Sequence, residues 1–351
     1  MKKNIWKILL FIVLVIIATI YPFFFTNLYS YDEVWNFGFA KNILDGLIPY
    51  KDFNMIVPPI FPYLTAIVIR IFGEKLIVYY AFIAVIVTSI TFLASKKIGW
   101  NASLIYISLL IYSSNGYNTA SLLLLFILLI LLEKELKHQD IILPIIISLM
   151  VLTKQTMGLL IIPNLIYSKN KKKTIATYIV CFLIFLAYLL INNSLMQFLD
   201  YCLFGMFEFT EKNQLSIPMY LIIEVAICFI LAFNLIKSKG QRKDIFYVLM
   251  YQIIAFPITD VSHFVLAWVP NIYLLFQRSN IPKFARNAAF AVILTIEVSV
   301  LLICNYNVTI HNKGYIGYST SETFIKGKLV PTITDTYINE ISKYVERYPE
   351  Y

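Results

Sequence analysis

Residues 141–167 read IILPIIISLMVLTKQTMGLLIIPNLIY, an apolar stretch whose one charged residue is Lys154. Basic residues flank it on both sides, at Lys134 and Lys137 before it and at Lys169 and positions 171–173 after it. Because basic loops of membrane proteins stay in the cytoplasm, both ends are expected inside, so the chain must cross outward and return. Each arm holds about twelve residues, which is roughly 18 Å of helix against a hydrocarbon core of ~30 Å.

The turn between the two arms, Thr153-Lys154-Gln155, is therefore expected to lie below the outer surface of the membrane. Polar backbone at that depth is tolerated only where it lines a cavity or is buried in protein. The hairpins around residues 115–118 and 257–263 have similarly short arms. This pattern predicts a recessed cavity on the outer side.

The composition of the whole chain is typical of a membrane protein. Of its 351 residues, 60% are apolar or aromatic and 14% are charged, whereas soluble domains carry about 25% charged residues. The net charge of +9 lies mostly in short loops, where it sets membrane orientation, so nucleic acid is not needed to explain it. The four cysteines lie in apolar surroundings without paired spacing, which favours packing over a metal site or a disulfide framework.

Apolar segments recur along the chain, and the distribution of basic residues indicates which of them span. The segments are 8–28, 57–73, 76–95, 99–114, 117–132, 141–152, 156–167, 174–191, 216–236, 245–257, 264–277 and 284–304. If 57–73 lies on the outer surface, eighteen basic residues before the tail fall inside and six outside, which satisfies the positive-inside rule. Pro58, Pro59, Pro62 and Arg70 also suit an interfacial helix better than a span.

The sequence therefore predicts an all-α polytopic membrane protein with about eleven transmembrane helices and additional juxtamembrane helices outside the cytoplasm. Residues 1–304 are expected to form the transmembrane module, with 29–75 as its first outer loop. Residues 305–351 are expected to form a short extracytoplasmic tail, with a helix over 335–347 that has nothing obvious to pack on. The protein is expected in the plasma membrane, with its N-terminus in the cytoplasm. The first helix is expected to remain in the protein as an uncleaved helix.

Two adjacent carboxylates, Asp32 and Glu33, follow the first span directly. A carboxylate at an apolar boundary can be held by nearby cations and act as a base. The alternative is that Asp32 or Ser30 caps the helix that begins near Glu33. The residues alone leave both interpretations open.

Other polar groups are expected on the same outer side. Lys154 is a cation in a thin apolar hairpin, where it could bind a phosphate or form a structural ion pair. Asp260 and His263 lie three apart at an outer turn and could contact phosphate or substrate, or could cap a helix. Glu224 and Glu297 lie within spans, where they could relay protons or hydrogen-bond between helices.

The order of these motifs resembles the GT-C superfamily of membrane glycosyltransferases. It is most similar to glycosyltransferase family 39, which includes protein O-mannosyltransferases and lipid A aminoarabinose transferases. The residues that carry the resemblance are Tyr31-Asp32-Glu33, the run from Ala40 to Gly46, Pro49-Tyr50-Lys51-Asp52-Phe53, Pro58-Pro59 and Phe72-Gly73. Thr153-Lys154-Gln155 and the run from Asp260 to His263 also look like outer-loop motifs of bacterial members.

The resemblance implies an inverting enzyme that transfers a sugar from a polyprenyl-phosphate donor to an acceptor hydroxyl on a glycan, lipid or protein. Asp32 would be the catalytic base, supported by Glu33, and the donor phosphate and substrate would contact Lys154, Gln155, Asp260, His263, Asp52, Asn115 and Asn118. No cofactor or metal ligand set is implied, and a requirement for a divalent metal stays open. The chain departs from many relatives in its small tail and in having Asn115-Gly116-Tyr117-Asn118 where they have another acidic residue.

Two other classes of function remain open on the sequence. A transporter or flippase of lipid-linked sugars would depend on Glu224 and Glu297 and would show internal repeats, which the sequence does not show. A noncatalytic membrane assembly factor would tolerate alanine throughout its outer polar clusters.

Overall fold

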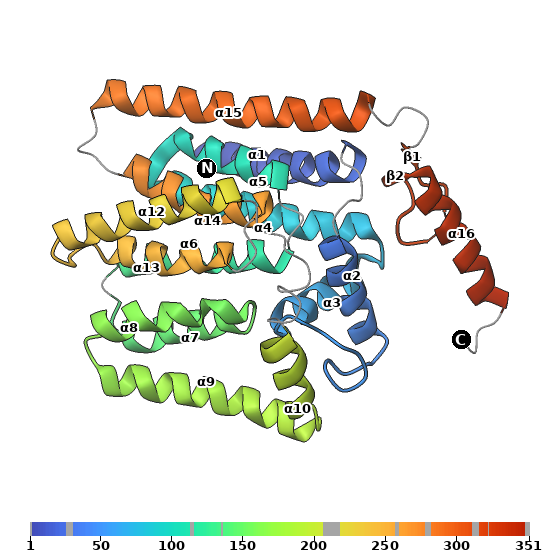
Figure 1. Cartoon of the computed structure of the whole chain (residues 1–351), viewed down its shortest axis with the longest axis horizontal. Helices are drawn as coiled ribbons and strands as arrows, with labels where there is room; N and C mark the ends of the chain where they lie inside the picture. Colours follow the sequence, from blue (N-terminus) through green and yellow to red (C-terminus); the bar gives the residue numbers. More distant parts are fainter. Residues whose placement is uncertain are drawn as a thin grey trace.

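The chain folds into a bundle of helices with a two-stranded sheet near its C-terminus (Figure 1). The computed structural model describes residues 2–25, 31–112, 116–134, 136–205, 218–256, 260–277, 282–310, 316–321 and 323–347. The α-helices are α1 (Lys2–Ile20), α2 (Tyr31–Leu44), α3 (Ile60–Phe72), α4 (Leu76–Ile98), α5 (Ala102–Tyr112), α6 (Gly116–Leu132), α7 (Gln139–Val151), α8 (Ile161–Tyr167), α9 (Lys171–Ile191), α10 (Leu195–Phe198), α12 (Pro218–Lys237), α13 (Lys243–Tyr251), α14 (Val261–Gln277), α15 (Lys283–Ile310) and α16 (Thr332–Arg347). Short 3₁₀ or π turns are η1 (Tyr21–Phe25), η2 (Gly99–Asn101), η3 (Gln155–Leu160), η4 (Leu199–Phe204) and η5 (Gln252–Ala255), and the strands are β1 (Ile316–Tyr318) and β2 (Leu329–Pro331).

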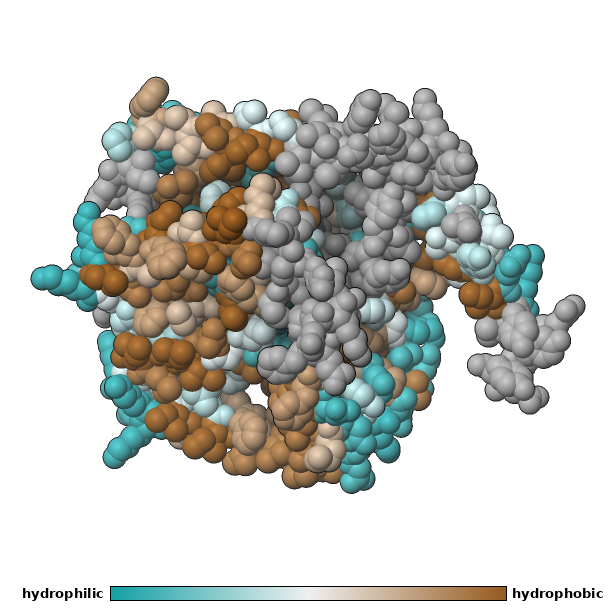
Figure 2. Space-filling model, viewed as in Figure 1, coloured by the Kyte–Doolittle hydropathy of each residue, from teal (hydrophilic) through white to brown (hydrophobic). Residues whose placement is uncertain are grey.

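The helical, membrane-type fold predicted from the sequence is confirmed. Within the described ranges, four helical segments are long and apolar enough to cross a membrane: Ile5–Phe25, Leu76–Leu110, Lys171–Ile191 and Met219–Lys237. Shorter apolar helices lie between them, so the count of about eleven spans stays a prediction. Figure 2 shows hydrophobic residues across the middle of the bundle and hydrophilic residues at its two ends.

The hairpin over 141–167 has the short arms that its sequence predicts. Helix α7 ends at Val151, the chain turns through residues 152–154, and the 3₁₀ turn η3 precedes the seven-residue helix α8. Lys154 is extended at this turn, with φ −148° and ψ 116°, and its side chain is only 7% exposed. The cation is therefore enclosed by protein at the point where the two arms meet.

The cytoplasmic loops of the predicted topology meet at one end of the bundle. Glu133 forms an ion pair with Lys97 and accepts a hydrogen bond of 2.7 Å from Gln277. At the same end Tyr167 donates a hydrogen bond of 2.7 Å to the carbonyl of Gly240. These contacts join loops that the positive-inside rule assigns to a single side.

Segment 57–73, which the basic residues predict to lie on the membrane surface, forms helix α3 and packs against α2. Figure 1 shows α2, α3 and α10 gathered at one end of the bundle, where α2 and α10 run across the direction of the long helices. Pro59 precedes the first helical residue, and Gly73, with φ 108°, ends the helix. Helices α2 and α3 therefore cover the end of the bundle opposite the basic loops.

The tail packs on the membrane module, although the sequence offers nothing obvious for its helix to pack on. Its helix begins at Thr332, slightly before the predicted residue 335, and α15 continues past residue 304 to Ile310. The contact is made by the turn before β2, where the Phe324 carbonyl accepts a hydrogen bond of 2.9 Å from the amide of Leu76. Ile325 and Val330 are fully buried in the main core. The anchor is thus a short apolar segment and not the helix.

Helix α6 begins in close contact with its neighbours, and Gly116 makes this possible. A Cβ at Gly116 would collide with Phe61 Cζ of α3 and would lie 2.5 Å from the hydroxyl oxygen of Tyr79 on α4. We expect Gly116→Ala to lower the free energy of unfolding by about 1–3 kcal/mol, because overpacking forces side chains off their rotamers. Thermal unfolding in detergent measures this loss.

Gly158→Ala is the matched control, because no atom lies within 4 Å of a Cβ at Gly158. Phe61→Leu should restore part of the stability in a Gly116→Ala background, since it removes the ring that the new methyl group meets. Equal stability of Gly116→Ala and the wild type would contradict the close contact.

Candidate functional site

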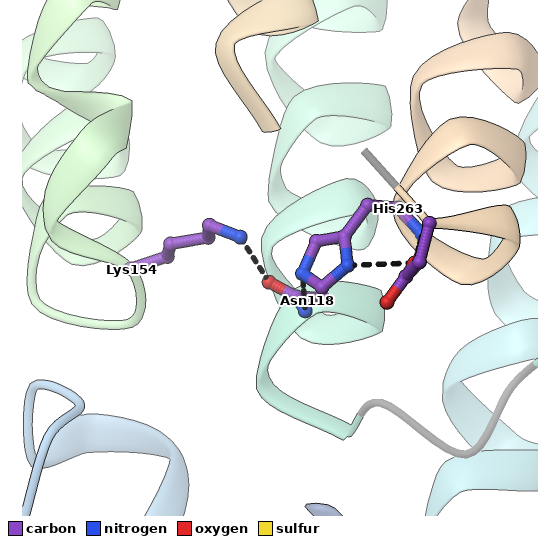
Figure 3. A network of polar contacts seen from close by, with 4 residues as sticks. Asn118, Lys154 and His263 are labelled. Carbon is purple, nitrogen blue, oxygen red and sulfur yellow. Dashed lines mark hydrogen bonds and ion pairs between the residues drawn. The ribbon is translucent and has the colours of Figure 1, made fainter. Parts of the chain in front are cut away.

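A chain of hydrogen bonds joins three parts of the molecule that are far apart in sequence (Figure 3). Lys154 Nζ, at the turn after α7, donates to Asn118 Oδ1 on α6 over 2.8 Å. Asn118 Nδ2 lies 3.4 Å from His263 Nε2 near the start of α14, and His263 Nδ1 lies 2.9 Å from Asp260 Oδ1. Asp260 also accepts from the backbone amide of His263 over 2.8 Å. The network therefore fixes the first turns of two helices to the hairpin turn.

The direction of this network follows from its two ends. The Lys154 ammonium can only donate, so the Asn118 oxygen faces it and the Asn118 amide nitrogen faces His263. His263 Nε2 must then accept, which leaves the ring proton on Nδ1 to be donated to Asp260. Burial raises the pKa of Asp260, but the hydrogen bonds that it accepts from the ring and the backbone amide of His263 outweigh burial and lower the pKa below its ordinary value. Asp260 is thus a carboxylate that orients the imidazole.

Two contacts position the Lys154 ammonium. Asn118 offers an uncharged oxygen, and the Tyr117 ring lies with its centroid 5.8 Å from Nζ. Asn118 is fully buried, and His263 is 8% exposed. An anion brought against Lys154 would meet a positioned cation in surroundings of low dielectric constant, where electrostatic attraction is strong.

Gln155 has a different role in the structure from its neighbour. Its side-chain amide donates to the backbone carbonyl of Ile56 over 3.3 Å and to that of Cys202 over 2.8 Å. These bonds tie the hairpin turn to the segment before α3 and to η4. The amide group of Gln155 therefore positions backbone around the site.

A second buried cluster surrounds Glu33, on the helix that follows the first span. The Tyr80 hydroxyl on α4 donates to a Glu33 carboxylate oxygen. Lys328, from the tail, lies with Nζ 5.6 Å from the Tyr80 ring centroid and donates to the carbonyl of Pro22 over 2.8 Å. Burial lowers the pKa of Lys328 to about 8, and the negative charge of Glu33 opposes that shift. Glu33 and Lys328 are thus both buried near the Tyr80 side chain.

The two clusters lie on either side of the start of α6. The rings of Tyr79 and Tyr80 are 5.9 Å apart, and the Tyr79 hydroxyl faces Gly116, two residues before Asn118. Helix α2, which carries Glu33, also contacts α6. The first outer loop and the Lys154 network therefore share one end of the bundle.

Three other residues predicted for the site are Asp32, Asn115 and Asp52. Asp32 lies in the first turn of α2, and its side chain lies outside the part of the structure that is described. Asn115 also lies outside the described residues. Asp52 is exposed and accepts a hydrogen bond of 2.8 Å from the amide of Ile48, so it closes a turn of the first outer loop.

Two functional candidates were not identified from the sequence. Lys328 follows Gly327 and precedes the short apolar strand β2, a pattern typical of a surface turn. Tyr80 is the second of two tyrosines near the start of α4, which indicates only an interfacial position. No local pattern links either residue to Glu33.

An apolar cavity lies next to the turn that carries Lys154. It has a volume of about 550 Å³ and lies between α3, α4, α6 and α7. Its lining includes Ala120 of α6 and Thr153, whose hydroxyl donates to the carbonyl of Leu149 over 2.8 Å and so presents no free polar group. Leu64 and Leu149 also line the cavity and are 46% and 36% exposed, so the cavity opens at the apolar surface of the bundle.

The carboxylates inside the bundle differ from each other. Glu297 of α15 accepts a hydrogen bond from Ser108 of α5, which fits the interhelical role considered for it. Glu224 of α12 is fully buried, and neither of its carboxylate oxygens has a hydrogen-bond partner among the described residues. Over the same residues, no group of three His, Cys, Asp or Glu side chains could hold a metal ion.

Comparisons with known proteins leave the site to be interpreted from its chemistry. No protein-family model, no curated protein and no solved structure matches this chain.

Proposed function

We propose that the protein is an inverting membrane glycosyltransferase that takes a sugar from a polyprenyl-phosphate donor. The acceptor is a hydroxyl of a glycan, lipid or protein on the extracytoplasmic face of the plasma membrane. The N-terminus lies in the cytoplasm, and the site and the C-terminus lie outside. The remaining predicted spans complete a bundle of about eleven helices around this site.

The observation that carries the proposal is that Thr153, the residue before Lys154, lines the apolar cavity. Thr153 lines the cavity, and the next residue in the chain presents an ammonium held by Asn118. A polyprenyl-phosphate has the matching chemistry, since a long apolar chain ends in an anion. The cavity would take the first isoprene units, and Lys154 would take the phosphate.

The transfer step needs a base, a nucleophile and a stabilised leaving group. The acceptor oxygen attacks the anomeric carbon and forms the new glycosidic bond, while the bond from that carbon to the phosphate oxygen breaks. The electron pair of the broken bond stays on the phosphate, whose added charge Lys154 stabilises. The proton of the acceptor hydroxyl goes to Asp32 in the first turn of α2.

The role of the cavity is tested by filling it. In Ala120→Phe, a large side chain occupies the space that the isoprenoid chain requires. We expect the KM for undecaprenyl-phosphate hexoses to rise about tenfold, while the KM for hexoses carried on a short, water-soluble prenyl phosphate stays within about twofold. Transfer of radiolabelled hexose by the purified protein in lipid nanodiscs measures both values.

Val85→Phe is the control for added bulk, because Val85 lies on α4, is 42% exposed and does not line the cavity. An equal rise of both KM values in Ala120→Phe would reject the cavity as the site of the lipid chain. Absence of transfer from every donor by the wild-type protein would reject the enzyme itself.

A transporter or flippase of lipid-linked sugars is the second candidate, and Glu224 is the observation that favours it. A fully buried carboxyl without a described hydrogen-bond partner is suited to bind and release protons. Glu224→Gln and Glu297→Gln should abolish flipping of a fluorescent polyprenyl-phosphate sugar in vesicles if this function is correct. Unchanged flipping in both variants would exclude it.

A further inference from the structure

The tail reaches the core of the bundle through one tight turn. Gly327 has φ 76°, a conformation that glycine adopts without strain, and its amide donates to the carbonyl of Ser319 over 2.9 Å. The amide of Ser319 in turn donates to the carbonyl of Lys328 over 2.9 Å. Lys328 is therefore held on a rigid hairpin, and its side chain is fully buried.

The same turn packs against helix α2. The ring of Phe324 stacks on that of Phe37 with centroids 5.2 Å apart and an interplanar angle of 16°. Phe37 lies one helical turn after Glu33, so both side chains lie on the face of α2 that the tail covers. The backbone bond from Leu76 to Phe324 fixes the turn to the start of α4 as well.

The tail places a cation near Glu33. The carboxylate is 4% exposed and receives the Tyr80 hydroxyl, and the charge of Glu33 acts on the Lys328 ammonium near the same ring. A buried carboxylate is costly without a compensating charge. Removal of one partner of such a pair is far more disruptive than removal of both.

We propose that segment 319–330 is a fixed part of the candidate site and that Lys328 is a positioning residue, which neutralises Glu33 and so holds α2 against the bundle. Asp32 is adjacent to Glu33 in the chain, so the tail sets the position of the proposed base. Only this last step rests on the proposed function. The charge pair and the docking of the tail stand independently of it.

The test removes the two charges singly and together and measures docking of the tail in purified protein, without substrate. The variants are Lys328→Met, Glu33→Gln and the double variant. Each carries a C-terminal tag, and the rate at which limiting proteinase K removes the tag is measured. We expect both single variants to lose the tag roughly tenfold faster than the wild type, because each removes one of two opposite buried charges. The double variant should return to within about twofold of the wild type.

Lys326→Met is the matched control, since Lys326 lies two residues away in the same turn and is exposed. Lys328→Met behaving like Lys326→Met, or a double variant no slower than the single variants, would overturn the proposal. If Lys328→Met yields no folded protein, the double variant decides: recovery of folded protein supports the pair, and failure rejects it.

The failure of the proposed function is a separate result. Recovery of docking in the double variant, combined with full transfer by Asp32→Asn, would keep the positioning role of Lys328 for α2 and remove the base.

Discussion

Lys154→Met is expected to reduce sugar transfer at least about a hundredfold, the loss that follows removal of one charged or hydrogen-bonding group from the reacting oxygen. Methionine keeps most of the volume of the lysine side chain and removes its charge. The hydrogen bond to Asn118 would also be lost. Initial rates with radiolabelled undecaprenyl-phosphate hexose, measured at saturating acceptor, give the effect.

Companion variants separate charge from position. Lys154→Arg keeps the charge but replaces a compact ammonium with a larger planar guanidinium, so partial activity is expected. Asn118→Ala should lower the rate by a smaller factor, and the double variant Lys154→Met with Asn118→Ala should be no worse than Lys154→Met alone. This non-additivity follows because Asn118 acts through Lys154.

Lys51→Met is the control, since Lys51 is an exposed cation of the first outer loop. A full rate in Lys154→Met would remove the phosphate-binding role, whatever the effect on Asn118. A loss that is equal in Lys51→Met would indicate a general effect of surface charge on lipid substrates.

Asp32→Asn is expected to lower the rate of transfer about a hundredfold or more, with donor binding unchanged within about twofold. General-base catalysis contributes factors of about 10² to 10⁴, and asparagine keeps the shape of the side chain without accepting a proton. Tryptophan fluorescence on titration with undecaprenyl-phosphate hexose measures binding, and Trp35 on α2 lies near the site. A base affects the chemical step, so the loss should fall on kcat.

Asp45→Asn serves as the control, because Asp45 is an exposed carboxylate of the same loop that pairs with Lys41 at 2.8 Å. Full activity of Asp32→Asn would reject the base. A loss confined to donor binding would assign Asp32 to the substrate contact instead.

More of the candidate site than of the details of the fold could be predicted from the sequence. Lys154 was identified because a cation between two short apolar arms has a high cost in lipid, and Asp260 with His263 because residues three apart share a helical face. The structure brings these residues into one network. Asn118, which links them, was expected from the resemblance to contact the donor phosphate or substrate, but no local pattern predicted its contacts with Lys154 and His263.

Local chemistry was enough to predict the apolar segments and the position of the turn at 152–154. The contacts between polar groups that are distant in sequence depend on the tertiary structure. Lys328 contacts the carbonyl of Pro22 across 306 positions, and Asn118 meets His263 across 145. Transfer of a side chain from water is a property of that side chain, whereas a buried contact depends on how several helices pack together, which no local pattern records.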